Sequence, residues 1–291
     1  MKSLVNRVAA IHDLSCFGRT SLAVVIPILS TMGVQVCSLP TALLSTHTGG
    51  FKDYHFIDLT EHLQATIEHW QKLGVEFDCY YSGFLGSPQQ VDLISQLMDS
   101  YVGEKPLTVI DPVLGDDGML YQTMDKNMVI KMREFISRAN IITPNFTEAA
   151  YLLNEKFSAD ISVKKIKEWL VRLSEMGPET VIITSVPDCK VAKNTCVMAY
   201  DSLAKRFWKV SCVYIPAFFP GTGDTFTSVV VGSILQGDSL PIAIDRAVQF
   251  ITTAIRASYG YDYPRREGIL LERVLSSLNL PVVAGSYELI E

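Results

Sequence analysis

Short runs of β-branched and aromatic residues recur along the chain up to residue 184 and predict six strands. These are Arg7–Ile11, Val34–Leu39, Cys79–Ser82, Leu107–Asp111, Asn140–Thr143 and Thr180–Thr184. Segments with the period of an amphipathic helix lie between them. Strands that alternate with helices pair in parallel, because a parallel connection needs a crossover. The strands are also short and strongly apolar, which favours a sheet covered on both faces.

Two of the intervening segments show the helical period clearly. Leu63, Ile67 and Trp70 follow i, i+4, i+7. A second segment places four apolar residues on one helical face, at Ile166, Trp169, Leu170 and Leu173. Its charged residues fall on the other face. Both patterns are typical of surface helices that cover a sheet.

The pattern changes after Ser185. Val191–Tyr200 and Arg206–Tyr214 predict an antiparallel hairpin at one edge of the sheet. Three helices are expected downstream, at about Thr222–Gln236, Pro241–Ser258 and Leu270–Leu278, followed by a loose tail. No repeat, low-complexity segment or linker divides the sequence. We therefore expect a single domain over residues 1–291.

Composition narrows the class of protein. The 291 residues are 48% hydrophobic and 19% charged, with a net charge of −6, which argues against disorder and against nucleic-acid binding. The apolar stretch Leu22–Met32 is too short for a membrane span and contains Pro27. The chain start has no signal-peptide pattern. Six scattered cysteines without a CxxC pair predict buried free thiols in a reducing cytoplasm.

Ligands of open α/β sheets bind beyond the carboxyl ends of the strands. The strongest chemical signal there is the run Gly221-Thr222-Gly223-Asp224, which opens a predicted helix. The glycines let the backbone approach a ligand, and the free N–H groups of a helix start bind anions. Asp224 would lie beside a bound phosphate as a candidate base. The alternative is plain capping, with Thr222 as the cap and Asp224 favourable to the helix dipole.

Three further segments lie at strand ends, and each has a simpler alternative. The aspartates of Asp111–Gly118 could place Mg²⁺ or its waters, or form an Asp/Gly turn. Asn145 and Glu148 share one face of a helix start and could aim at the same magnesium–phosphate group, or form a capping box. Thr184 and Ser185 could donate to a nucleotide phosphate, or form an ordinary turn.

The conjunction of the four segments decides between these alternatives. Each lies at the end of a predicted strand or the start of a predicted helix, so all four can converge on one crevice. Independent turns would have no reason to supply a carboxylate, an anion site and metal-type oxygens together.

At these residues the chain resembles the ribokinase-like superfamily, and within it the pyridoxal (vitamin B6) kinases. The matching motifs, in order, are Ser45–Gly49, Ser82–Ser87, Asp111–Asp116, Gly118–Tyr121, Ile142–Ala149, Ile183–Ser185 and Gly221–Asp224. The resemblance spans about residues 5 to 260. It implies a ribokinase-like three-layer α/β/α sandwich, with a mostly parallel central sheet and an antiparallel edge hairpin. It also implies ATP-dependent phosphorylation of the 5′-hydroxymethyl group of pyridoxal, pyridoxamine or pyridoxine.

The resemblance implies a role for each matching residue. Asp224 would be the base, and the anion hole would comprise Gly221, Thr222 and Gly223. Mg²⁺ and its waters would be organised by Asp111 and Glu148, together with Asn145. The ATP side would be lined by Asp116, Tyr121, Asn145, Thr184 and Ser185. The substrate pocket would be lined by Asp13, Ser15, His47, Thr48 and Phe84. Members are commonly homodimers, and many use a monovalent cation such as K⁺.

Two positions depart from the family pattern. Asp13 stands where many B6 kinases have serine, and a carboxylate there could pair with a protonated pyridine nitrogen or an amine. Phe84 replaces a tyrosine and removes a hydroxyl contact. The rival enzyme is a hydroxymethylpyrimidine or sugar kinase with the same machinery. Hydroxymethylpyrimidine kinases tend to carry cysteine in the glycine-rich motif, so Asp224 favours B6. A non-catalytic vitamin- or nucleotide-binding protein is the alternative of another class.

Overall fold

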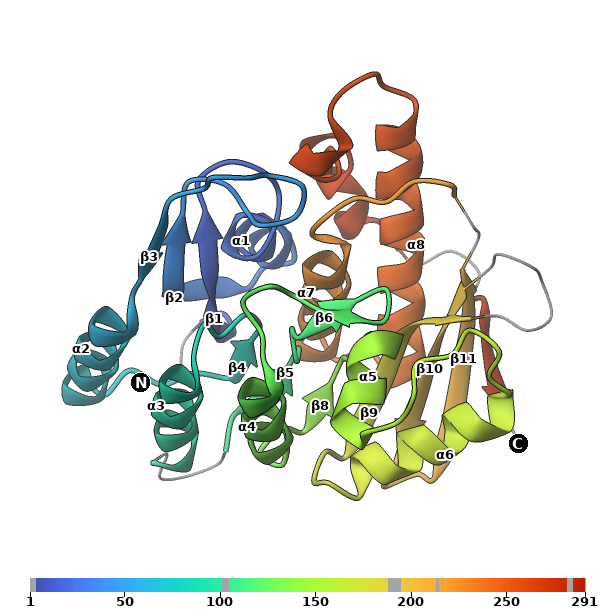
Figure 1. Ribbon diagram of the computed structural model, residues 1–291, viewed down its shortest axis with the longest axis horizontal. Helices are drawn as coiled ribbons and strands as arrows, with labels where there is room; N and C mark the ends of the chain where they lie inside the picture. Colours follow the sequence, from blue (N-terminus) through green and yellow to red (C-terminus); the bar gives the residue numbers. More distant parts are fainter. Residues whose placement is uncertain (1–3, 101–104, 188–194, 213–214, 282–284, 291) are drawn as a thin grey trace.

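A ten-stranded sheet forms the centre of the computed structural model, which describes residues 4–100, 105–187, 195–212, 215–281 and 285–290 (Figure 1). Its strands are β1 Arg7–Ser15, β2 Gln35–Leu44, β3 Phe56–Asp58, β4 Cys79–Ser82, β5 Leu107–Ile110, β8 Ile141–Ile142, β9 Thr180–Pro187, β10 Thr195–Asp201, β11 Arg206–Cys212 and β12 Tyr287–Ile290. Their order is β12-β11-β10-β9-β8-β5-β4-β1-β2-β3. A separate two-stranded sheet pairs β6 (Gly115–Asp116) with β7 (Met119–Leu120).

The six strands expected from the sequence form the parallel part of this sheet, in the order β9-β8-β5-β4-β1-β2. β4 has the predicted bounds, whereas β8 is shorter than expected and β1 runs on to Ser15. The register of β1 against β2 shifts between His12 and Leu14. Because an irregularity of this kind re-aims side chains at the end of a strand, it bears on the placement of Asp13.

Helices cover both faces of the sheet, which confirms the predicted three-layer sandwich (Figure 1). One face carries α2 Thr60–Leu73, α3 Pro88–Asp99, α4 Lys126–Ile136, α5 Phe146–Leu153 and α6 Val163–Ser174. The other carries α1 Leu22–Thr31, α7 Thr222–Leu235 and α8 Leu240–Tyr259. Alternate strand residues serve the two cores, as in β1, where Ala9 and Ile11 face the first and Val8 and Ala10 the second.

Local signals account for the helix bounds. Ser87, Asp125 and Ser162 begin α3, α4 and α6 by accepting a backbone N–H, as good N-caps do. The predicted apolar stripe of α6 is buried, with Trp169 nearly inaccessible. The expected helices near 222–236 and 241–258 are confirmed as α7 and α8.

The C-terminal part differs from expectation in two ways. The predicted hairpin is formed by β10 and β11, but its residues 191–194 and 213–214 lie outside the described residues. It is not the outermost element, because β12 pairs antiparallel with β11, where a loose tail was expected. The expected helix near Leu270–Leu278 is wrong: two 3₁₀ turns, Leu271–Arg273 and Leu275–Asn279, replace it. No described side chain caps either turn, and a helix this short is marginal without a cap.

The sequence predicts buried cysteine thiols and no membrane span, and the structure bears on both predictions. The five described cysteines form no disulfide with one another, and Cys189 lies outside the described residues. Cys79 and Cys196 are buried as predicted, whereas Cys16 is exposed. Among the described residues no helix is both long and apolar enough to cross a membrane.

Candidate active site

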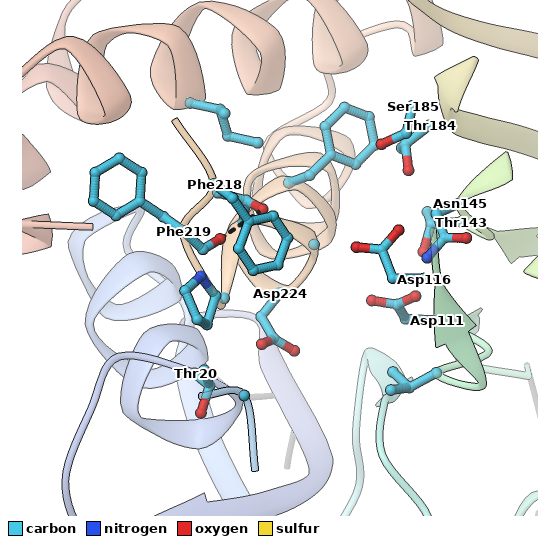
Figure 2. A pocket seen from close by; sticks show the side chains of 18 of the residues that line it. Thr20, Asp111, Asp116, Thr143, Asn145, Thr184, Ser185, Phe218, Phe219 and Asp224 are labelled. Carbon is cyan, nitrogen blue, oxygen red and sulfur yellow. Dashed lines mark hydrogen bonds between the residues drawn. The ribbon is translucent and has the colours of Figure 1, made fainter. Parts of the chain in front are cut away.

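A cavity of about 650 Å³ opens where the parallel strands end and α5 and α7 begin. Every residue that the sequence assigns to the site lines this cavity, except Ser15. In Figure 2, Asp224 faces the cavity from one side, and Asp111 and Asp116 face it from the other. The predicted convergence of the four segments is therefore confirmed.

The first turn of α7 forms one wall of the cavity. Its N-cap residue is Gly221, and no described side chain caps the helix start. The capping alternative for Thr222 is wrong, because this residue lies inside the helix and its Oγ1 donates to the carbonyl of Phe219 at 3.3 Å. The helix start thus keeps backbone N–H groups and the positive end of its dipole available to an anion.

The two glycines of this turn serve different purposes. Gly221 has φ of 81°, and a Cβ there would lie 2.1 Å from the carbonyl oxygen of Arg19, so no other residue fits. Gly223 has no positive φ, and a Cβ there would meet nothing within 4 Å. Since Gly223 lines the cavity, its missing side chain leaves room for a ligand rather than for protein.

Asp224 projects from this turn into a nearly closed environment. Its Oδ2 accepts the backbone N–H of Ser21 at 2.8 Å, and its Oδ1 lies 4.0 Å from Nδ1 of His12. Burial raises the pKa of Asp224 to about 7, with a further contribution from the charge of Asp13, while the Ser21 bond opposes the shift. A carboxylate with a pKa near neutrality is well matched to accept a proton at physiological pH.

Asp13 lies at the irregularity near the end of β1 and is buried. Oγ of Ser21 donates to its Oδ1 at 2.5 Å, and Oγ of Ser15 donates to its Oδ2 at 3.3 Å. Burial raises the pKa of Asp13, and the two serine hydroxyls partly offset this. Ser15 therefore contacts Asp13 but does not itself line the cavity, contrary to its predicted place in the substrate pocket.

Asp111 and Glu148 lie on the opposite wall. Oγ1 of Thr227 is 3.4 Å from Oδ2 of Asp111 and 2.9 Å from Oγ1 of Thr143. Burial and the charge of Asp224 hold the pKa of Asp111 well above its usual range. Burial does the same to the pKa of Glu148.

Glu148 and Asn145 form the capping box that was the simpler alternative. Oε2 of Glu148 accepts the N–H of Asn145 at 2.7 Å, and Oδ1 of Asn145 accepts the N–H of Glu148 at 2.9 Å. Oε1 of Glu148 also accepts the N–H of Leu114. Both residues still line the cavity, so capping fixes their position without removing them from it.

The β6–β7 hairpin carries Asp116 and Tyr121 to the cavity. Asp117 and Gly118 have φ of 50° and 79°, as the turn of a tight hairpin requires, so the Asp/Gly turn is confirmed. Nδ2 of Asn145 donates to the carbonyl of Gly115 at 2.8 Å and ties this hairpin to α5. Burial raises the pKa of Asp116.

Thr184 and Ser185 reach the cavity because β9 is irregular there. Ile183 and Val186 pair with Met198 and Cys196, so two residues of β9 stand opposite one of β10. Ser185 has φ of 57°. The pair belongs to a continuous strand rather than to a turn, and the extra residue turns their side chains toward the ligand space.

His47 lines the cavity, but both of its ring nitrogens have partners. Nε2 lies 2.6 Å from the carbonyl of Arg266, and Nδ1 accepts the N–H of Gly49 at 3.0 Å. These partners fix the tautomer with the proton on Nε2. His47 therefore ties the 47–49 loop to the loop after α8, and offers a ligand its ring rather than a free nitrogen.

Acidic residues dominate the charge of the cavity. They are Asp13, Asp111, Asp116, Asp117, Glu148 and Asp224, and no described Lys or Arg lines it. Because no described cationic side chain lines the wall, a polyphosphate bound here would need accompanying cations to neutralise its charge. The described residues hold no group of three or more side chains that could bind a metal alone. The set fits Mg²⁺, which binds through one or two carboxylates, substrate phosphates and retained waters.

Sequence reasoning missed the residues that complete the walls. Ser21 and Thr20 precede α1 and line the cavity, and α8 adds an apolar wall with Ile251 and Ile255. A serine before an apolar helix is a recognisable N-cap signal, but nothing in its spacing links it to Asp224. His12 has no partner readable from spacing either. The α8 residues are indistinguishable from ordinary core positions.

Comparison with known proteins places this geometry in a family. A family model described as phosphomethylpyrimidine kinase matches residues 26–266. A structure with pyridoxal of a Bacteroides thetaiotaomicron protein, provisionally assigned as a phosphomethylpyrimidine kinase, is 53% identical; the match covers 98% of this chain and 100% of that chain, with a TM-score of 0.95.

Two further relatives show the range of activities around the chain. The structure of pyridoxal kinase from Lactobacillus plantarum is 31% identical, with 95% and 97% of the two chains covered and a TM-score of 0.84. This likeness identifies the sandwich as the ribokinase-like fold. The hydroxymethylpyrimidine/phosphomethylpyrimidine kinase of Haemophilus influenzae is 26% identical, over 77% of this chain and 81% of its own.

Proposed function

Because the chain belongs to the phosphomethylpyrimidine kinase family, a family of ATP-using kinases, we propose that it phosphorylates a B6 vitamer. The reaction transfers a phosphoryl group from ATP to the 5′-hydroxymethyl group of pyridoxal, pyridoxamine or pyridoxine. The B6 assignment is supported by the pyridoxal-bound structure at 53% identity and by the pyridoxal kinase at 31% identity.

The observation that carries the proposal is Asp224 in the first turn of α7, a helix start that no described side chain caps. Its pKa of about 7 leaves it largely ionised above neutral pH and able to take the hydroxyl proton. Phosphoryl transfer is loose, so the nucleophile needs little negative charge early, and Asp224 orients the hydroxyl before it accepts the proton. The N–H groups at Gly221, Thr222 and Gly223 stabilise charge on the transferred group.

The opposite wall would hold the nucleotide. Asp111 and Glu148 would hold Mg²⁺ through waters, and the ion would screen the phosphates from the acidic side chains. Asn145, Asp116 and Tyr121 would line the phosphate side, with Thr184 and Ser185 donating hydroxyls. The acidic cavity would also tolerate a monovalent cation such as K⁺.

The alcohol would bind between Asp13 and the 47–49 loop. Asp13 would accept from a protonated ring nitrogen or an amine, and Phe84 would pack against the ring. Thr48 would add a polar contact, while His47 and Ser15 would hold the loop and Asp13 in place. We further propose that the protein acts as a homodimer in the cytoplasm, whose reducing conditions would keep its cysteines as thiols.

The proposal is tested by ATP-dependent phosphorylation across a panel of alcohols. The panel comprises pyridoxal, pyridoxamine, pyridoxine, hydroxymethylpyrimidine and ribose, with Asp224→Asn as the matched control. Preference for a B6 vitamer, lost in the variant, is the expected result. Turnover of hydroxymethylpyrimidine or ribose alone would keep the mechanism and refute the B6 assignment. Binding of a vitamer or of ATP without turnover would favour the non-catalytic alternative.

A further inference from the structure

Ser21 is hydrogen-bonded to two of the carboxylates that line the cavity. Its Oγ donates to Oδ1 of Asp13 at 2.5 Å, and its backbone N–H donates to Oδ2 of Asp224 at 2.8 Å. The three residues come from β1, the start of α1 and the first turn of α7. Ser21 lines the cavity but is only 8% exposed, so both bonds are largely shielded from bulk water.

The backbone of Ser21 adopts a conformation that suits glycine better. Its φ is 50° and its ψ is −132°, in a region that side chains other than glycine occupy at a cost. Helix capping does not account for a serine here, because the hydroxyl makes no capping bond to α1. The bond to Asp13 is what the hydroxyl contributes, and glycine could not supply it.

The segment that contains Ser21 is fixed from both sides. Gly221 packs directly against the carbonyl of Arg19, and the N–H of Arg19 donates to the carbonyl of Glu267 at 3.1 Å. The Arg19 guanidinium pairs with Glu272 at 2.9 Å. On the helix side, the carbonyl of Ser21 accepts two backbone N–H groups of α1. Ser21 is therefore a rigid point between the two carboxylates.

We infer that Ser21 is a positioning residue that holds Asp13 and Asp224 in one fixed arrangement. An alcohol bound against Asp13 then presents its hydroxyl to the oxygen of Asp224 that Ser21 leaves free, Oδ1. The substrate oxygen forms its bond to phosphorus as the bond to the ADP oxygen breaks, and the hydroxyl proton passes to Oδ1. The reaction step in this inference rests on the proposed function. The two hydrogen bonds of Ser21 do not depend on it.

Two substitutions at Ser21 separate its hydroxyl from its backbone. Ser21→Ala removes the hydroxyl and keeps the unfavourable φ, so the chain can relax and withdraw the N–H from Asp224. Ser21→Gly also removes the hydroxyl but tolerates that φ, so the N–H stays in place. We expect kcat to fall about tenfold in Ser21→Ala and less than threefold in Ser21→Gly. Equal kcat values in the two variants would overturn the link to Asp224.

A double-mutant cycle with Asp13→Ala tests the other bond. Ser21→Ala and Asp13→Ala should each raise KM for the alcohol about tenfold. The KM of the double variant should be no more than twofold above that of either single variant. KM for ATP should stay within twofold throughout. Ser15→Ala, which removes the longer bond to Asp13, should have the smaller effect. Multiplicative KM effects in the double variant would overturn the link to Asp13.

The wild-type panel keeps this test separate from the proposed function. If the protein phosphorylates hydroxymethylpyrimidine instead of a B6 vitamer, the B6 assignment fails and the cycle is measured with that alcohol. If no alcohol is phosphorylated, the same four proteins are compared by their thermal unfolding midpoints. Shifts smaller in the double variant than the sum of the single shifts would support the Ser21–Asp13 link, and additive shifts would overturn it.

Discussion

Nδ1 of His12 lies 4.0 Å from Oδ1 of Asp224, yet the two side chains do not form an ion pair. The imidazole is fully buried, and neither of its nitrogens has a hydrogen-bond partner among the described residues. Burial lowers the pKa of His12 to about 3 and raises that of Asp224 to about 7. Both groups are therefore neutral between about pH 3 and pH 7. A rise in pH increases the stability that His12 contributes and decreases the stability that Asp224 contributes.

His12 should make the fold sensitive to acid. Its folded pKa of about 3 lies below the unfolded value of 6.5, so the unfolded chain binds more protons between them. Stability from this group is complete above pH 6.5 and is lost toward pH 3, by about 1.4 kcal/mol per pH unit. His12→Gln should lose less stability between pH 7 and pH 5 than the wild type, measured by urea unfolding. His62→Gln, at an exposed position of α2, is the control, and parallel curves for all three proteins would contradict the prediction.

Asp224 should show the opposite trend. Its folded pKa of about 7 lies above the value of 3.8 that the unfolded chain would have, so the folded state binds more protons in that window. Stability is therefore lost as pH rises from about 4 to 7, by a few kcal/mol in all. Asp224→Asn should be more stable than the wild type at pH 8 and about equal to it at pH 4. Thermal unfolding at the two pH values measures this, and an equal difference at both would count against it.

The same pKa sets the pH dependence of the reaction. Protonated Asp224 cannot accept the hydroxyl proton, so kcat/KM, which reports the free enzyme, should fall about tenfold per pH unit below pH 7. Asp224→Asn should lower kcat by about 10² to 10⁴ while the Kd for ATP changes little. Initial rates and isothermal titration measure these quantities. A wild-type profile that is flat between pH 5 and pH 8 would exclude Asp224 as the base.

A methyl group added at Gly223 tests whether a ligand binds at the start of α7, because it would obstruct the ligand without touching the protein. Gly223→Ala adds a Cβ that meets no protein atom within 4 Å, at a residue of the cavity wall without a positive φ. We expect kcat/KM to fall at least tenfold with an unchanged or higher Tm, because alanine favours a helix. Gly260→Ala, at the exposed end of α8 and equally unobstructed, is the matched control. Comparable activity of the two variants would mean that no ligand group approaches Gly223.

Removal of divalent cations should abolish turnover and weaken ATP binding. The cavity is lined by acidic side chains and by no described Lys or Arg, so no described side chain neutralises the charge of ATP when Mg²⁺ is absent. EDTA should stop the reaction, and added Mg²⁺ should restore it. Asp111→Asn should raise the Mg²⁺ concentration for half-maximal rate at least tenfold. If metal-free ATP bound as tightly as Mg-ATP in titration calorimetry, the charge argument would be wrong.

Local patterns in the sequence determined the parallel strands, the apolar helices and the segments that bear the chemistry. The alternation within β1, the stripe of α6 and the turn at Gly221 are encoded by neighbouring residues, so their spacing alone predicts them. The same applies to the meeting of the site segments, because parallel strands place their carboxyl ends at one edge.

The tertiary structure alone decided how those segments are connected. Ser21 and Asp224 are 203 positions apart, and only the packing of α1 against α7 brings them together. Packing likewise joined β12 to the sheet edge and gave both nitrogens of His47 protein partners. It also buried His12 without a hydrogen-bond partner among the residues that the structure describes. Such features depend on which distant elements meet and how much water they exclude. The spacing of neighbouring residues predicts secondary structure and the ends of strands. It does not predict which distant elements pack together or how much water they exclude.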